Sequence, residues 1–168
     1  SENEFFVYDK VVLASHADES LNILSDPSEQ EKEILSNFKY RKNIAVIHGD
    51  ESSMPKNKKA WCSWNSSLDP INKEKSSVTY WLNQLQNLKI NKDIFLTINP
   101  FFEIDSNKIY NKIDFTHPYY DEKALKNQTK LNSIQNINNT LFAGSYFGYG
   151  FHEDGIKSSI EMLKTLND

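Results

Sequence analysis

The sequence predicts an α+β fold in which a mainly antiparallel sheet is flanked by helices. Two observations lead to this prediction. Short β-rich segments separated by polar loops fill the middle of the chain, and segments with helical patterns lie on both sides of them. The expected strands are residues 43–48, 60–63, 77–82, 93–98 and 112–116, the last of which should end at His117-Pro118.

The segment before this block combines a buried strand with two helices. Residues 10–15 form a short continuous apolar run, typical of a strand that is buried on both faces. A helix should follow at about 19–24. A second helix should start at Asp26-Pro27-Ser28-Glu29, with Asp26 as N-cap, Pro27 in the first helical position and Glu29 completing a capping box.

The segment after the block carries one more strand and a final helix. Residues 121–135 have a weak helical pattern, and 140–144 form a strand that leads into a glycine-rich turn. The last helix should cover 153–166, with Ile156, Ile160, Leu163 and Leu166 near one face. We therefore divide the chain into 1–42, 43–118 and 119–168, with the sheet layer in the middle.

The composition limits the function classes. The 168 residues suit one ordinary domain, and a net charge of -4 argues against a basic nucleic-acid-binding protein. We expect a soluble, cytoplasmic protein, because we find neither an apolar run of about 20 residues nor a signal-peptide pattern.

The four histidines lack the spacing of a metal site, so no metal is expected. The single cysteine, Cys62, lies in an apolar stretch and is interpreted as a small core residue.

Residues 140–159 carry the pattern most suggestive of chemistry. A strand ends at Gly144, a loop with two more glycines follows, and a helix begins near Glu153. The first turn of a helix offers unpaired N–H groups and the positive end of its dipole. Gly155 adds no side chain to that turn. A phosphate or an electron-rich ring could lie there. A plain strand–turn–helix connection is the alternative. The sequence contains no Gly-x-Gly-x-x-Gly or P-loop motif.

The same segment resembles a known motif. Leu141-Phe142-Ala143-Gly144 followed by His152–Ser159 is similar to the closing FAD-binding motif of flavin-dependent amine oxidases. More narrowly, Tyr146–Gly155 resembles a bacterial group of amine-oxidase-like proteins described as NAD/FAD-binding. Collinear upstream matches to that group extend the resemblance over nearly the whole chain: Val11–Asp18, Ala45–His48, Trp61–Asn65, Val78–Trp81, Thr97–Pro100 and Phe115–Pro118.

The resemblance implies the carboxy-terminal part of an FAD-dependent oxidoreductase that transfers a hydride from an organic substrate to flavin. The amino-terminal half, which would bind most of the FAD, is then missing, so weak or absent FAD binding and no activity are expected of this chain. Gly144 and Ser145 would lie near the pyrophosphate and ribityl chain, and Ser145 replaces the usual acidic residue. The backbone amides of Asp154, Gly155 and Ile156 would face the flavin. The full expected set is Gly144, Ser145, Tyr146, Gly148, Gly150, Phe151, His152, Glu153, Asp154, Gly155 and Ile156.

The substrate is less well defined. Trp64, Tyr80, Trp81 and Tyr149 are candidates to wall a cavity for a small-molecule or lipid-derived substrate, although aromatic residues on strands are also typical of a core. Many amine oxidases place a lysine on an early substrate-domain strand, and the nearest residues here are Lys42 and Asn43. Amine oxidation therefore stays open, and no general base is indicated. The alternatives are a flavin-dependent lipid desaturase or isomerase, and a binding or structural module without redox activity.

Overall fold

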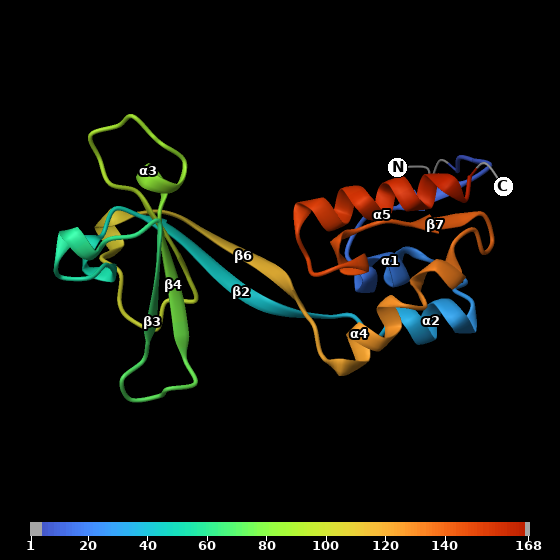
Figure 1. The fold of residues 1–168 in the computed structure, drawn as a ribbon, viewed down its shortest axis with the longest axis horizontal. Helices are drawn as coiled ribbons and strands as arrows, with labels where there is room; N and C mark the ends of the chain where they lie inside the picture. Colours follow the sequence, from blue (N-terminus) through green and yellow to red (C-terminus); the bar gives the residue numbers. More distant parts are fainter. Residues whose placement is uncertain (1–4, 167–168) are drawn as a thin grey trace. The chain divides into compact units, whose positions relative to one another are not determined.

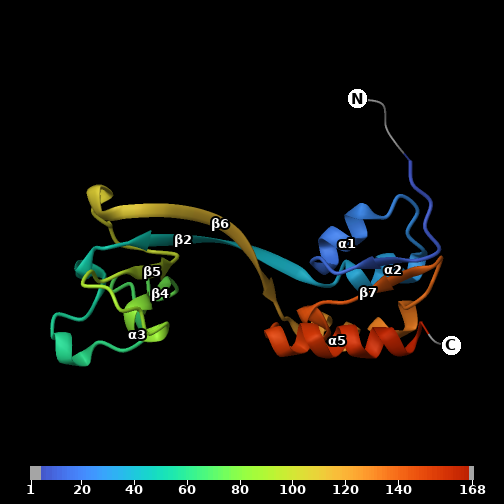
Figure 2. The same ribbon diagram turned by 90° about the horizontal axis from the view of Figure 1, so that it is seen from above.

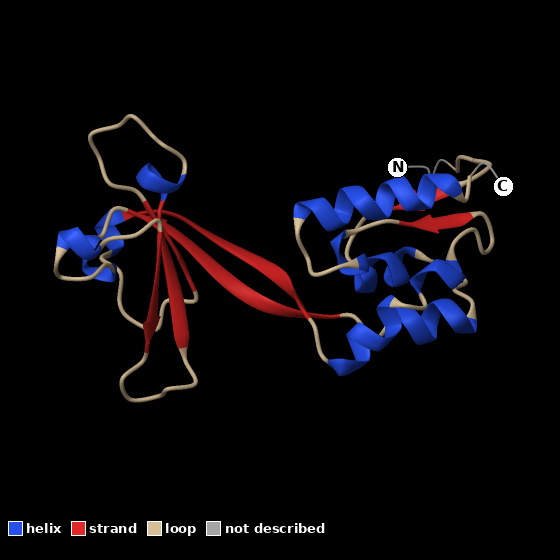
Figure 3. Cartoon of the chain, viewed as in Figure 1, coloured by secondary structure: helices blue, strands red, loops and turns tan. Residues whose placement is uncertain are grey.

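The computed structural model describes residues 5–166, which form two compact units (Figure 1). Unit 1 is built from the chain up to Arg41 and from Pro118 onward, and unit 2 is Lys42–His117. Figure 3 shows that helices dominate unit 1 and strands dominate unit 2. The α+β prediction with a mainly antiparallel sheet and flanking helices is confirmed.

Unit 1 is a three-layer arrangement around two parallel strands, β1 (Val11–Leu13) and β7 (Thr140–Phe142). Successive side chains of a strand point to opposite faces. Leu141 accordingly packs with Met162 of helix α5 (His152–Lys164). Phe142 packs into the cluster on the other face. Figure 2 shows α5 and α1 on opposite sides of β7.

That second face is covered by short helices. They are α1 (Ala17–Ile23), α2 (Glu29–Leu35), α4 (Glu122–Gln128) and the 3-10 helix η4 (Leu131–Ile134). Their most deeply buried apolar side chains are Ala17, Ile34, Leu35, Ala124, Leu131 and Ile134. Tyr40 contacts the start of α1, where its hydroxyl accepts a hydrogen bond from Ala17 N at 2.9 Å. Burial raises the pKa of Tyr40 to about 12.

The start of α2 differs from the prediction. Ser28 is the N-cap: its Oγ accepts from Glu31 N at 3.2 Å, and Glu31 Oε2 accepts from Ser28 N at 2.7 Å. The predicted Asp26–Glu29 box is therefore wrong by two residues. Both pairs have the capping-box spacing, and the pair that forms is Ser28 with the buried Glu31.

Unit 2 is built on a five-stranded sheet in the order β3-β4-β5-β2-β6. The strands are β2 (Lys39–His48), β3 (Trp64–Leu68), β4 (Ser76–Trp81), β5 (Phe95–Ile98) and β6 (Ile109–Tyr119). The pairs β2–β5, β3–β4 and β4–β5 are antiparallel. Short helices connect them: η1 (Glu51–Ser53), η2 (Lys58–Ala60), α3 (Leu82–Leu85) and η3 (Ser106–Lys108).

Three details of this sheet correct the sequence predictions. Residues 60–63 are not a strand, since η2 ends at Ala60 and β3 begins at Trp64. Cys62 lies in the intervening loop and is exposed, so its expected place in the core is wrong. Strand β6 continues through Pro118, which its position at the sheet edge allows.

One face of the sheet forms the core of unit 2. Trp61 meets the rings of Trp81 and Phe95 edge-on, at centroid distances of 5.3 and 5.6 Å. Beside them His48 Nε2 is hydrogen-bonded to Thr97 Oγ1 at 2.8 Å, and Nδ1 of the same ring accepts from Asp50 N at 3.1 Å. His48 is fully buried, and this burial lowers its pKa below the ordinary value.

The buried histidine predicts a pH-dependent stability. Because the pKa of His48 is lower in the folded chain, the unfolded chain binds more protons as the pH falls through the ordinary histidine value of about 6.5. The free energy of unfolding of unit 2 should therefore decrease between pH 7.5 and pH 5. Urea unfolding followed by tryptophan fluorescence measures it, and His48→Gln should flatten the dependence. An equally steep decrease in His48→Gln would contradict this assignment.

Candidate functional site

The end of β7 and the first turns of α5 are joined by a small hydrogen-bond relay. Gly144 N donates to Ser158 Oγ at 2.9 Å, and Ser158 Oγ donates to Gly155 O at 2.7 Å. The relay holds the strand end against the helix. Of the expected cofactor residues, the structure thus brings Gly144, Ser145 and Gly155 together.

The start of α5 is closed by its own acidic side chain. The Asp154 carboxylate accepts from Tyr149 N at 2.9 Å and from Phe151 N at 3.0 Å. The amides of Asp154 and Gly155 both donate to Phe151 O, at 3.0 and 3.3 Å. Both amides, which were expected to face a ligand, thus already have an acceptor at the start of the helix.

This capping interaction yields a stability prediction. Asp154→Ala leaves two loop amides without their acceptor and removes a negative charge from the positive end of the helix. We expect a loss of about 1 kcal/mol in the stability of unit 1. Thermal unfolding followed by circular dichroism measures it. The control is Glu153→Ala, which removes an exposed first-turn carboxylate and should change stability far less. Equal effects would show that Asp154 is not a cap.

Gly155 differs from the neighbouring glycines. A side chain at Gly148 would collide with the Asp154 carboxyl group, and Gly150 has a φ of +91°, so the loop itself requires both. A Cβ at Gly155 would meet nothing closer than Ser145 N, at 3.8 Å. Glycine inside a helix costs about 1 kcal/mol relative to alanine. The packing of the described residues does not explain this cost, whereas close approach of a ligand to the helix backbone would.

Ser145 supplies unused hydrogen-bonding groups at the same place. Within residues 5–166, its amide donates to no acceptor and its hydroxyl has no partner. Its carbonyl accepts from the amides of Gly148 and Gly150, both at 3.1 Å, which fixes the backbone. A preorganised amide and a hydroxyl beside a bare helix turn can bind a phosphate oxygen or a sugar hydroxyl.

The other expected cofactor residues lie elsewhere. Tyr146 is buried in the core of unit 1, where desolvation raises its pKa. Tyr149 and Phe151 are 72% and 70% exposed. The side chains of His152, Glu153 and Ile156 are exposed on the outside of α5. Among the described residues, no group of three or more His, Cys, Asp or Glu could hold a metal ion.

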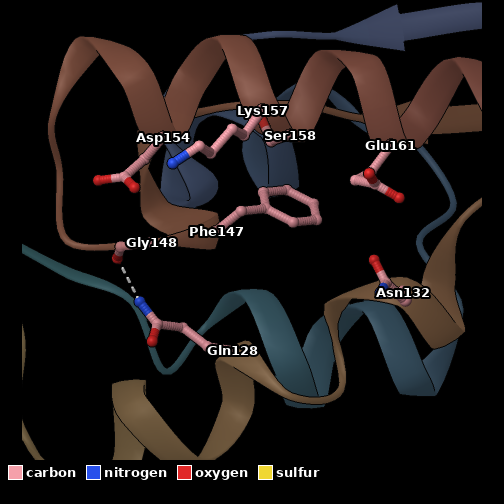
Figure 4. Close-up of a pocket in the computed structure, with 8 residues that line it drawn as sticks. All are labelled: Gln128, Asn132, Phe147, Gly148, Asp154, Lys157, Ser158 and Glu161. Carbon is pink, nitrogen blue, oxygen red and sulfur yellow. Dashed lines mark hydrogen bonds between the residues drawn. The ribbon is translucent and has the colours of Figure 1, made fainter.

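An open pocket of about 230 Å³ lies alongside α5 (Figure 4). It is lined by Gln128, Asn132, Phe147, Gly148, Asp154, Lys157, Ser158 and Glu161. Gln128 Nε2 donates to the carbonyls of Tyr146, at 3.1 Å, and of Gly148, which fixes the loop that forms one wall. The sequence reasoning missed this pocket, although the spacing of Asp154, Lys157 and Glu161 places them on one side of a helix. Its mixed charges suit a polar group of a ligand.

Unit 2 presents a different kind of surface. On the sheet face opposite its core, Tyr80 pairs with Leu96 and Leu96 with Ile47, so their side chains lie in one row. Trp64 is 68% exposed and stacks on Tyr80, with ring centroids 6.4 Å apart. Antiparallel sheets with an open face usually carry polar residues there. The open face of this sheet is instead rich in apolar and aromatic side chains.

A pocket of about 390 Å³ opens on this face. Its lining residues are Asn43, Tyr80, Leu96, Ile98, Phe115 and His117, which include no carboxylate and no amine. Lys42 borders a different pocket, of about 520 Å³, together with Asn99 and Asp114. Asn43 and Phe115 line both pockets, whereas Lys42 lines only the second. The two-residue periodicity of β5 could have revealed Leu96 and Ile98.

The four expected substrate residues do not form one wall. Trp64 and Tyr80 are on the open face, but Trp81 lies on the core face and its Nε1 donates to Asp93 Oδ1 at 2.9 Å. Adjacent residues of a strand point in opposite directions, so Tyr80 and Trp81 cannot line the same side of the sheet. Tyr149 belongs to unit 1.

Comparisons with solved structures show a relationship of fold. No protein-family model and no curated protein matches the chain. Among solved structures, the chain is similar to the crystal structure of a CLA-producing fatty acid isomerase from P. acnes, with a TM-score of 0.56 and 16% sequence identity. The match covers 94% of this chain and 41% of that chain. The chain thus has the fold of one part of that isomerase and spans less than half of its length.

Proposed function

We propose that the chain is the carboxy-terminal part of an FAD-dependent oxidoreductase, in which unit 1 holds one side of the flavin cofactor and unit 2 lines the substrate site. The observation that carries this proposal is Gly155, a helix glycine without a packing reason, beside the unused amide and hydroxyl of Ser145. FAD, when bound, would supply a hydride acceptor. The resemblance of residues 140–159 to the closing FAD motif of amine oxidases supports the same site.

The residues present fit one portion of the cofactor. The Ser145 amide suits a phosphate oxygen, and its hydroxyl can donate to or accept from a ribityl hydroxyl. Gly155 offers a flat surface on the helix. The chain has no Gly-x-Gly-x-x-Gly segment for the remaining pyrophosphate contacts. Another part of the polypeptide would have to contribute them.

Titration of the 168-residue chain with FAD tests this partial site. We expect quenching of flavin fluorescence only at concentrations well above micromolar, since most contacts to the cofactor lie outside the chain. Submicromolar affinity would show that the chain carries a complete site. Riboflavin serves as the control ligand, because it lacks the phosphates and should bind even more weakly.

The open sheet face favours an apolar, lipid-derived substrate over an amine. Its pocket combines Leu96, Ile98 and Phe115 with uncharged amide and phenol groups. A cationic amine would gain no carboxylate partner from these lining residues, whereas an acyl chain would bury apolar surface. The related fold of a fatty acid isomerase is consistent with this choice. A flavin-dependent lipid isomerase or desaturase is thus the second candidate function.

A substitution on this face tests the substrate class. Leu96→Asn replaces a central apolar side chain of the pocket by an amide and should weaken binding of a fluorescent polyene fatty acid by about tenfold or more, from the loss of 1.5–3 kcal/mol of apolar contact. The control is Asn111→Ala, at an exposed position of β6. Unchanged binding in Leu96→Asn, with an unchanged circular dichroism spectrum, would contradict a substrate site on this face.

A further inference from the structure

Within residues 5–166, no strand pairs with the outer edge of β1. The parallel register places Val11 opposite Thr140 and Leu13 opposite Phe142. Val11 N donates to Asn139 O at 3.0 Å, and Leu13 O accepts from Ala143 N at 3.1 Å. In a parallel pair, alternate residues direct their amide and carbonyl to opposite edges. Both main-chain groups of Val12 therefore point away from β7, and no described residue bonds them.

The outer edge of β7 is closed by contrast. Phe142 N donates to Gln135 Oε1 at 2.9 Å, and Gln135 Nε2 donates to Phe142 O at 2.7 Å. Thr140 N donates to Ile137 O at 2.9 Å, and Thr140 O accepts from Asn136 N at 2.8 Å. The side chain of Gln135 and the 136–137 backbone thus stand in for a third strand. The sheet is capped on one side and open on the other.

The open edge is also apolar. Val11 and Val12 are 45% and 46% exposed, although both belong to a strand that helices flank on either face. Parallel strands are normally buried on both faces, and a bare apolar edge is a template for pairing. Two strands of three residues make a marginal sheet by themselves. On the outer side of α5, Ile156, Ile160 and Leu163 are likewise more than half exposed.

We infer that the outer edge of β1 is a docking site for a β-strand from a further polypeptide segment, which extends the sheet in parallel orientation. The segment would accept from Val12 N, donate to Val12 O and cover both valine side chains with apolar residues. The isomerase with this fold has more than half of its chain outside the shared part, so the fold occurs with additional polypeptide. A second copy of this chain fits less well, because twofold pairing of two β1 edges would be antiparallel.

This inference does not depend on flavin, since it rests on main-chain groups and apolar surface alone. Its test compares the isolated 168-residue chain with the same chain purified from its source cells through a carboxy-terminal tag, as the complete gene product or complex. Amide hydrogen exchange is followed over Lys10–Leu13. The Val12 amide should exchange quickly in the isolated chain and at least a hundredfold more slowly in the cellular form.

Two substitutions of Val12 distinguish a loss of strand pairing at this edge from a general loss of stability. Val12→Pro removes the outward N–H and should abolish stable association, whereas Val12→Thr keeps the N–H and a similar shape and should retain it. Fast exchange of Val12 in the cellular form would overturn the inference. So would protection in an assembly that native mass spectrometry shows to contain only copies of this chain. Loss of flavin binding by itself would test the proposed function and leave these results unaffected.

Discussion

Phe142→Ala lowers the free energy of unfolding of unit 1 by about 3–5 kcal/mol, the usual range for truncating a fully buried phenylalanine. Phe142, on β7, is completely buried in the cluster that Leu13 of β1 forms with α1, α2 and α4, and its backbone is bonded to Gln135. The surrounding side chains are held by different helices, so they cannot all move inward to fill the space. The resulting cavity should bring unit 1 close to its unfolding threshold at room temperature.

The distribution of tryptophans makes this prediction specific. All three tryptophans of the chain lie in unit 2, so their fluorescence reports on that unit alone. In Phe142→Ala, the urea transition seen by circular dichroism should gain an early phase, while the transition seen by tryptophan fluorescence should not move. The control Phe147→Ala, at a partly buried site, should cost much less. Equal displacement of both transitions would show that the two units unfold together.

Gly155→Leu is expected to weaken flavin binding by the complete gene product at least a hundredfold, equivalent to about 2.7 kcal/mol. Apart from its chain neighbours and its own helix backbone, the only described atom within 4 Å of a Cβ at position 155 is Ser145 N, at 3.8 Å, so the described fold accepts a Cβ there. A leucine would occupy the space that we assign to the cofactor. The loss should therefore appear in binding and not in folding.

Gly155→Ala should change the stability of unit 1 and the affinity for flavin in opposite directions. In the isolated chain it should stabilise unit 1 by up to about 1 kcal/mol, because alanine is the better helix residue. In the complete gene product it should weaken flavin binding. Thermal unfolding and flavin titration measure the opposite signs. Gly150→Ala is the contrasting control, since its positive φ predicts a loss of stability. Stabilisation of Gly155→Ala without any loss of affinity would remove the main support for the flavin site.

Periodicity and residue type were enough to predict most of the sheet. The predicted strands around Val46, Val78 and Thr97 are neighbours in the five-stranded sheet, and the predicted strand at Leu141 is present in the two-stranded sheet. The failures are local. Residues near Cys62 have an apolar pattern too short to distinguish a strand from a 3-10 turn and its exit loop. Pro118 was taken as a strand end, and only its place at a sheet edge explains why β6 continues.

The candidate site was predicted less completely than the fold. The glycine-rich turn indicated a segment in which the structure brings Gly144, Ser145 and Gly155 together. The sequence did not reveal that Asp154 would close the helix start, since a first-turn acid can face either the loop or solvent. Nor did it separate Tyr80 from Trp81, although strand alternation requires that they face opposite ways.

The most direct test of the account is the flavin content of the complete gene product, measured by absorption after denaturation releases the cofactor. The account predicts about one flavin per chain in the wild-type protein and little or none in Gly155→Leu, with both proteins folded by circular dichroism. A folded wild-type protein without flavin, which also fails to take up added FAD, would contradict the account and favour a binding or structural module without redox activity.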